Sequence, residues 1–165
     1  MKRADVIASI GASDIEQVDS VLRTFLRETH ARCVILVDRT GRLLTTIGDT
    51  GGLDEITFAS LAAADFEASD QLALLLGEQE FSALYHHNTR QSMYLADVGG
   101  LAILAALFDR KSTLGLIRLR TGRVVARLAA QFRDLAQRGP SGPVVQMEVG
   151  WAQEVESEID RLFTE

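Results

Sequence analysis

The chain of 165 residues contains 47% apolar and 24% charged residues, as an ordinary globular domain does. Its formal net charge of −6 argues against general attraction to nucleic acid or to anionic membranes, and its single cysteine excludes an internal disulfide. No stretch reaches the ~20 apolar residues of a membrane-spanning helix, and no secretory signal develops after Lys2 and Arg3. We therefore expect a cytoplasmic domain that neither inserts into membranes nor binds nucleic acid.

The first third of the chain predicts a helix followed by a β-hairpin. Ser13 and Glu16 have the spacing of a capping box, and residues 15–26 repeat apolar side chains at helical period. Two apolar runs, 33–37 and 43–47, are separated by a short turn that contains a glycine. Two such runs around a short turn indicate paired strands.

Residues 54–76 predict a second helix, which Asp54 begins and Gly77 ends. Its first turns are unusually rich in alanine: Ala59, Ala62, Ala63, Ala64 and Ala68. Small side chains would let another backbone approach closely, but alanine is also the best helix former. The residue pattern does not choose between these two readings.

Three further strands are predicted at residues 81–87, 91–96 and 101–108, followed by a long helix from about 112 to 136. The intervals between the strands are too short for helices, so the strands should form an antiparallel meander. The whole order is helix, two strands, helix, three strands, helix. That order predicts an α+β layered domain.

We expect four parts along the chain: an N-terminal extension (1–12), the domain (13–137), a linker (138–150) and a C-terminal amphipathic helix (151–165). The linker holds both prolines. The apolar stripe of the C-terminal segment consists of Trp151, Val155, Ile159, Leu162 and Phe163. An isolated helix of this length is marginal in water, so it should order only where that stripe docks. The sequence leaves open whether it docks on its own domain, on a sister subunit or on a partner.

Motifs for catalysis, metal binding or cofactor binding are not found. The chain has neither a phosphate-binding GxxxxGK[ST] loop nor GxGxxG. His86 and His87 are adjacent on a predicted strand and so point to opposite faces, while His30 stands alone near a helix end. Cys33 lies in an apolar run, as a small buried hydrophobic residue would. We expect no catalytic residues, no metal and no cofactor.

Charge is distributed unevenly along the C-terminal third. Residues 110–138 carry eight basic side chains against one acidic, whereas residues 148–165 carry six acidic side chains against one basic. Arg120, Arg123 and Arg127 should lie on one side of the last long helix. They could form a solvated face, bind phosphate or nucleic acid, hold an acidic protein, or hold the acidic tail of the chain itself.

Several strings, in order, resemble the roadblock family of small homodimeric domains, and within it the bacterial MglB-type branch of polarity regulators. They are VILVDRTGRLL (34–44), LLLGEQEF (74–81), MYLADVGG (93–100), FDRKSTLGLIRLR (108–120) and IDRLF (159–163). The resemblance covers most of residues 21–127 and the tail. It implies a five-stranded antiparallel sheet in roadblock/profilin-like layers, with the second helix on one face and the first and third helices on the other.

The resemblance also implies a homodimer in which the second helices pair and edge strands join. Such a platform binds a small Ras-like GTPase of the MglA type and stimulates GTP hydrolysis without an arginine finger. Carried onto this chain, the contact helix comprises Ala63, Ala64, Glu67, Ala68 and Gln71. The C-terminal stripe would be a second contact, which we expect to be mobile in the free protein and helical on the GTPase.

The chain departs from the family pattern in the contact helix. It reads Ala63-Ala64-Asp65 where MglB-like proteins commonly have Ala-Gly-Asn, and Glu67 replaces a small residue. Asp65, Glu67 and Asp70 should therefore make the platform more acidic and alter the choice of partner. The alternative hypothesis is a scaffold for a motor, filament or signalling complex that leaves nucleotide turnover unchanged.

Overall fold

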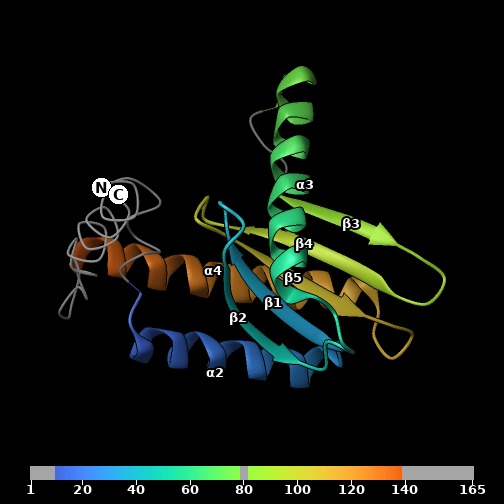
Figure 1. Cartoon of the computed structure of the whole chain (residues 1–165), viewed down its shortest axis with the longest axis horizontal. Coiled ribbons are helices and arrows are strands. Elements are labelled where there is room, and N and C mark those ends of the chain that lie inside the picture. The colour runs from blue at the N-terminus through green and yellow to red at the C-terminus, as the bar shows by residue number, and fades with distance from the viewer. Residues whose placement is uncertain (1–9, 79–81, 139–165) are drawn as a thin grey trace, which may run out of the picture.

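The computed structural model describes residues 10–78 and 82–138 and contains the predicted elements in the predicted order (Figure 1). These are α2 (Ala12–Thr29), β1 (Cys33–Asp38), β2 (Leu43–Gly48), α3 (Glu55–Leu75), β3 (Ala83–His87), β4 (Ser92–Val98), β5 (Ala102–Phe108) and α4 (Leu114–Arg138). Residues 1–9 of the expected extension (1–12), residues 139–150 of the expected linker (138–150) and the whole expected C-terminal helix (151–165) lie outside the described residues, so their structure stays a prediction. None of the helices described is both long and apolar enough to cross a bilayer.

The five strands form one antiparallel sheet in the order β2-β1-β5-β4-β3. The hairpin β1–β2 and the meander β3–β4–β5 join where β1 pairs with β5, with Val34 opposite Ala106. β2 and β3 are the two edges. The fold class is the one that the family resemblance implied, an α+β sheet of five antiparallel strands with three helices.

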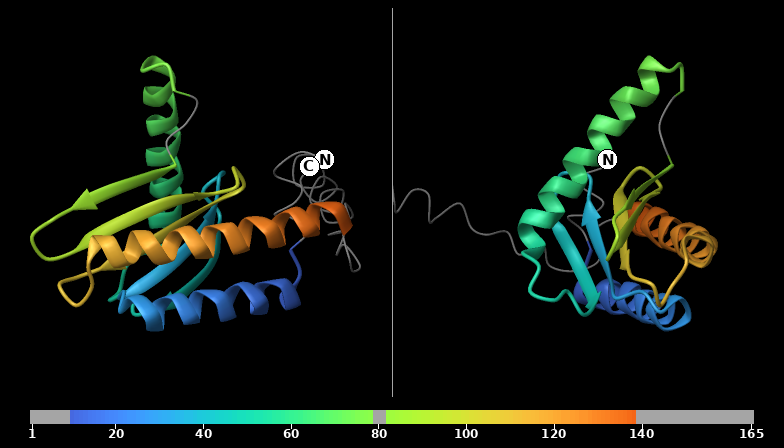
Figure 2. Two further views of the ribbon diagram at one scale, coloured as in Figure 1. Left: turned by 180° about the vertical axis from the view of Figure 1, so that it is seen from behind. Right: turned by 90° about the vertical axis from the view of Figure 1, so that its right-hand side faces the viewer.

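Helices cover both faces of the sheet, α3 on one side and α2 with α4 on the other (Figure 2). All six residues of β1 are buried because alternate side chains enter different cores. The α3 side contains Cys33, Ile35, Val37, Phe66, Leu95 and Ile103. The α2/α4 side contains Val34, Leu36, Phe25, Leu104, Ile117, Leu128 and Phe132. Double coverage explains why β1 and β5 read as continuous apolar runs.

The predicted start of the first helix was wrong by two residues. Gly11, rather than Ser13, is the N-cap: its N–H donates to the Asp14 carboxylate at 3.0 Å, and Ser13 is exposed within the helix. Ile10 packs against the α2/α4 core, so residues 10 and 11 belong with the domain. The cap predicted for the second helix is confirmed, since Thr57 N–H donates to Asp54 at 3.1 Å. Hydrogen bonds from the Thr57 side chain and backbone lower the pKa of Asp54.

The turn between β1 and β2 lies directly against α3. Gly41 has φ +90°, and a Cβ at this position would be 3.1 Å from Ser60 Cα. Only glycine combines this backbone conformation with so close an approach to a helix. The turn is therefore a fixed support beneath α3.

Candidate functional site

Helix α3 is buried on one side and apolar on its opposite, exposed side. Ala59, Ala62, Ala63, Phe66 and Ala73 pack on the sheet. On the outside, Leu61 is 64% exposed, Leu72 56% and Leu75 83%. The C-terminal half of the helix projects beyond the sheet (Figures 1 and 2). A domain rarely exposes so many large apolar side chains on one helix unless another surface covers them.

The spacing of these residues is that of a helix–helix contact. One line along α3 contains Thr57, Leu61, Ala64, Ala68, Leu72 and Leu75, all exposed, at steps of four, three, four, four and three. We call this line the exposed stripe of α3. Steps of three and four keep side chains on one side of a helix and suit packing against a second helix. Ala64 and Ala68 at its centre allow the two axes to approach closely, because interaxial distance depends on the side chains at the contact.

Four of the five contact residues predicted from the sequence lie on the exposed side of α3. Ala64, Glu67, Ala68 and Gln71 are exposed, and Gln71 Nε2 donates to Glu67 Oε1 at 3.1 Å. Ala63 is different, because it is only 7% exposed and packs in the core beneath the helix. Within one chain, Ala63 positions the helix and does not present a contact surface.

Two of the three acids expected to make the platform more acidic have partners within the chain. Asp70 accepts a hydrogen bond of 2.9 Å from Arg39, and its side chain is 17% exposed. Asp65 lies 2.7 Å from His86 Nε2 on β3. Asp70 thus has a cationic partner in Arg39, and Asp65 has the His86 ring on the edge strand. Glu67 is the one acid of the three that stands on the outer side with a neutral partner.

Arg39 is the residue that fixes the far half of α3, and sequence reasoning missed it. Its guanidinium donates to Asp70 on α3 and, at 2.5 Å, to Asp97 near the end of β4. It also lies 4.8 Å from the centre of the Phe66 ring. The string around residue 39 carried the family resemblance, but one sequence gives no sign that residues 31 and 58 positions away are its partners.

The predicted basic side of α4 is only partly free. Arg120 forms an ion pair of 3.0 Å with Glu28 on α2 and is partly buried. Arg123 and Arg127 are exposed. Arg120 thus helps to join the two helices on that face, and the other two arginines remain accessible to a ligand or a protein.

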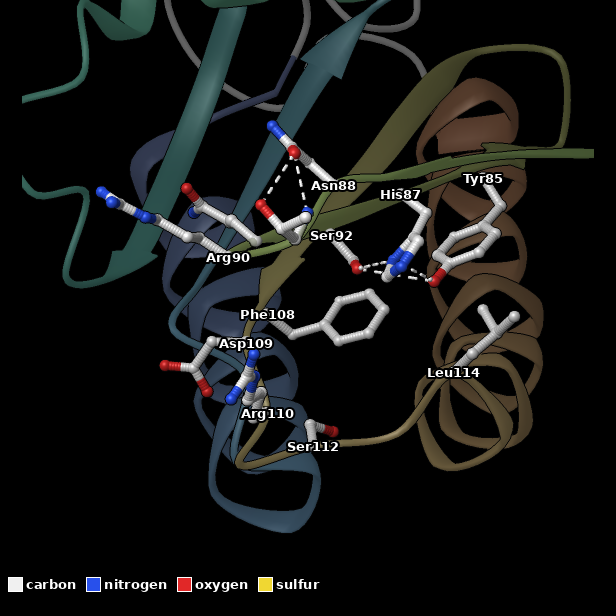
Figure 3. Close-up of a pocket in the computed structure, with 12 residues that line it drawn as sticks. Tyr85, His87, Asn88, Arg90, Ser92, Phe108, Asp109, Arg110, Ser112 and Leu114 are labelled. Carbon is white, nitrogen blue, oxygen red and sulfur yellow. Dashed lines mark hydrogen bonds between the residues drawn. The ribbon is translucent and has the colours of Figure 1, made fainter.

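A hollow of about 450 Å³ lies between the end of the β3–β4 hairpin and the loop that leads into α4 (Figure 3). Phe108 lines it, and Tyr85 stacks on Phe108 with ring centroids 6.4 Å apart. His87 Nδ1 lies 3.0 Å from Ser92 Oγ and 3.1 Å from the Tyr85 hydroxyl. Among the described residues, no carboxylate lies within 4.0 Å of His87 to orient it as a general base. The polar groups therefore join two strands at a sheet edge and do not form a recognisable catalytic arrangement.

The remaining candidates for chemistry are structural. Across residues 10–78 and 82–138, no three His, Cys, Asp or Glu side chains are grouped to hold a metal ion. Cys33 is 1% exposed, and burial raises the pKa of its thiol to about 11. A thiol in such an environment is a poor nucleophile. The predicted tail contacts, Trp151, Val155, Ile159, Leu162 and Phe163, lie outside the described residues.

The comparisons with known proteins agree with this architecture. The model of the Roadblock/LC7 domain matches residues 17–108, whereas no curated protein matches the chain. MglB from Myxococcus xanthus is 33% identical over 72% of this chain and 96% of its own, with a TM-score of 0.69. The gliding protein MglB from Thermus thermophilus is 33% identical over 76% and 94%, with a TM-score of 0.70. An MglB structure described as having a tetrameric arrangement is 32% identical over 76% and 94%, with a TM-score of 0.71. This chain belongs to the Roadblock/LC7 family, and its fold is that of MglB.

Proposed function

We propose that this protein is a cytoplasmic homodimeric regulator, without catalytic residues of its own, of a small Ras-like GTPase of the MglA type. It would bind the GTPase and stimulate GTP hydrolysis, in cell polarity or motility. The observation that carries the proposal is the exposed stripe of α3, an apolar helix face that the described elements of a single copy leave uncovered.

Self-association is the simplest way to cover the stripe. Two copies related by a two-fold axis would place Ala64 and Ala68 of one copy against the same line of the other. β3 is an edge strand, and His86 links it to Asp65 on α3, so strand and helix present one continuous side. An edge strand with unpaired backbone groups favours pairing with a second copy.

The GTPase would bind on the polar side of the paired helices. Glu67 and Gln71 lie beside the stripe and hydrogen bond to each other, so they present an amide and a carboxylate next to the two-fold axis. Residues 55–75 contain no arginine or lysine, so α3 has no cation to place on a transferring phosphate. The effect on hydrolysis would come from stabilising the GTPase conformation in which its own groups are aligned. The tail remains the predicted second contact.

The test uses the full chain and the small GTPase encoded nearest to it in the genome. We expect the GTP-loaded form to bind in analytical ultracentrifugation and the GDP-loaded form to bind less tightly. Ala64→Arg/Ala68→Arg should abolish binding, because it puts two long charges at the centre of the proposed contact. Arg23→Glu/Arg27→Glu on α2 is the charge control and should bind normally, and Arg123→Glu/Arg127→Glu on α4 should still bind. Loss of binding only in the α4 variant would favour the scaffold hypothesis, and no binding to either nucleotide form would remove the proposal.

A further inference from the structure

The outward side of α4 has no partner among the described elements. Ile117, Thr121, Leu128 and Phe132 are buried beneath the helix. The opposite line contains Gly115, Leu119, Gly122, Ala126 and Ala130, all exposed, with Leu119 58% exposed. Figure 2 shows α4 crossing the near side of the molecule in its left view, with no other coloured element over it. A leucine among small residues gives a shallow apolar face that a second helix could cover.

Basic side chains border this face along both edges. Arg118 lies on one edge, and Arg123 and Arg127 lie on the other. Within residues 10–78 and 82–138, none of these three arginines has a carboxylate within 4.0 Å. Over residues 115–130 the face is therefore apolar in the middle and positive at its margins, on a chain whose formal net charge is −6. The next turn adds the exposed Arg133 to the central line and the exposed Asp134 to the edge that holds Arg123 and Arg127.

We propose that, contrary to the mobile tail expected from the sequence, this face of α4 is the docking site of residues 151–165 of the same chain in the free protein. Written on a helix, that segment has an apolar stripe of Trp151, Val155, Ile159 and Phe163. Acidic residues border the stripe on both edges: Glu154 and Glu158 on one, Glu156 and Asp160 on the other. Each surface has an apolar stripe between charged margins, and the margins of the two surfaces carry opposite charge.

The length of the chain permits this docking without strain. α4 ends at Arg138, and residues 139–150 could span up to ~40 Å when extended. α4 itself is ~37 Å long and a 15-residue helix ~22 Å, at 1.5 Å per residue. A short loop suffices to return one helix antiparallel to another. The tail can therefore run back along α4 and bring Phe163 toward Leu119.

Charge favours the acidic tail over a second copy of α4 as the segment that covers this face. Two such faces would set Arg123 and Arg127 against arginines of the same kind, which costs free energy at a contact. The acidic tail would instead set carboxylates against these arginines. While docked, its apolar stripe would be unavailable to any other protein, so a partner that uses the tail must first displace it. The docking itself does not depend on GTPase binding.

Trp151 is the only tryptophan and reports directly on the tail. In the isolated full-length protein we expect its emission to be blue-shifted from that in urea and protected from acrylamide, a neutral quencher. Arg123→Glu/Arg127→Glu should remove both effects, and Leu119→Asp should do the same. Arg23→Glu/Arg27→Glu makes the same charge change at exposed positions of α2 and should leave both effects in place.

Three results would overturn the proposal. In the first, wild-type Trp151 is quenched as readily as in urea. In the second, protection survives both the α4 charge reversal and Leu119→Asp, so the tail docks elsewhere. In the third, an excess of Trp151→Phe chain with wild-type α4 restores protection to the Arg123→Glu/Arg127→Glu chain. That restoration would assign the tail to a second copy. The fluorescence measurement contains no GTPase. A negative result would therefore overturn the docking of the tail without overturning the proposed function.

Discussion

Arg39, in the turn between β1 and β2, donates a hydrogen bond of 2.9 Å to Asp70 in the second half of α3. The same guanidinium pairs with Asp97 near the end of β4. One side chain thus joins the first hairpin, the meander and the helix that carries the exposed stripe. The orientation of that stripe depends on this junction.

Replacing Arg39 with alanine should lower the free energy of unfolding by about 2 kcal/mol. The substitution leaves Asp70 and Asp97 partly buried without their cation, and losing one member of such a pair costs more than the pair contributes. The exposed fractions of 13–22% for these three side chains put the value below that of a fully buried pair. Chemical denaturation followed by circular dichroism measures it.

Arg42→Ala in the same hairpin is the matched control. Arg42 is 54% exposed, and its partner Asp38 keeps hydrogen bonds from the Thr40 backbone and hydroxyl. Its loss should cost less than ~1 kcal/mol. Equal destabilisation by the two substitutions would contradict the role given to Arg39.

Gly41→Ala should destabilise the domain more than Gly52→Ala does. Both glycines have positive φ, +90° and +82°, so each alanine bears a backbone cost of about 1 kcal/mol. The added Cβ meets Ser60 Cα at 3.1 Å in the first case and open space in the second. The difference between their unfolding free energies measures how tightly the turn packs on α3. A zero difference would mean that the contact is unimportant.

The sequence pattern was sufficient to predict the order of elements, because apolar period and glycine turns are local signals, whereas the two helical layers were implied by the family resemblance. Residues such as Ile35 and Val34 enter different cores, as alternation predicts. The partners of Arg39, Asp65 and Asp70 are not local. From the sequence pattern, Asp65 and Asp70 were therefore predicted to be acids of the contact surface. In the fold, His86 lies beside Asp65 and Arg39 lies beside Asp70. Of the exposed stripe of α3, only Ala64 and Ala68 were predicted as contacts, and its leucines were missed because alanine and leucine on all sides of a helix hide which side is buried.

Leu61→Glu/Leu72→Glu should convert the proposed dimer into a monomer that remains folded. Both leucines are more than half exposed in the single chain, so the substitutions remove no intrachain core contact. Light scattering coupled to size exclusion gives the mass, and circular dichroism gives the melting temperature. Leu119→Glu, an equally exposed leucine on α4, should leave the mass unchanged. A monomeric wild-type protein would contradict the pairing of α3.

Cys33 should be unreactive in the folded protein. With its pKa raised from 9.0 to about 11, the thiolate is scarce at pH 8, and the side chain is 1% exposed. Ellman's reagent should therefore react only as fast as the protein unfolds, whereas Ser20→Cys on α2 should react at once. The raised pKa also has a consequence for stability. The thiol of the unfolded chain ionises at lower pH than the buried thiol. The contribution of Cys33 to the free energy of unfolding is therefore complete below pH 9, and up to about 2–3 kcal/mol of it is lost between pH 9 and 11. Rapid labelling of wild-type protein at pH 8 would contradict the buried position.

The most direct test of the proposed function is single-turnover GTP hydrolysis by the small GTPase encoded nearest in the genome. We expect wild-type protein to increase the rate constant and Ala64→Arg/Ala68→Arg to leave it at the intrinsic value. Arg23→Glu/Arg27→Glu should increase it as wild type does, because its changes lie on the other face of the sheet. A rate constant that stays at the intrinsic value with saturating wild-type protein would contradict regulation through α3.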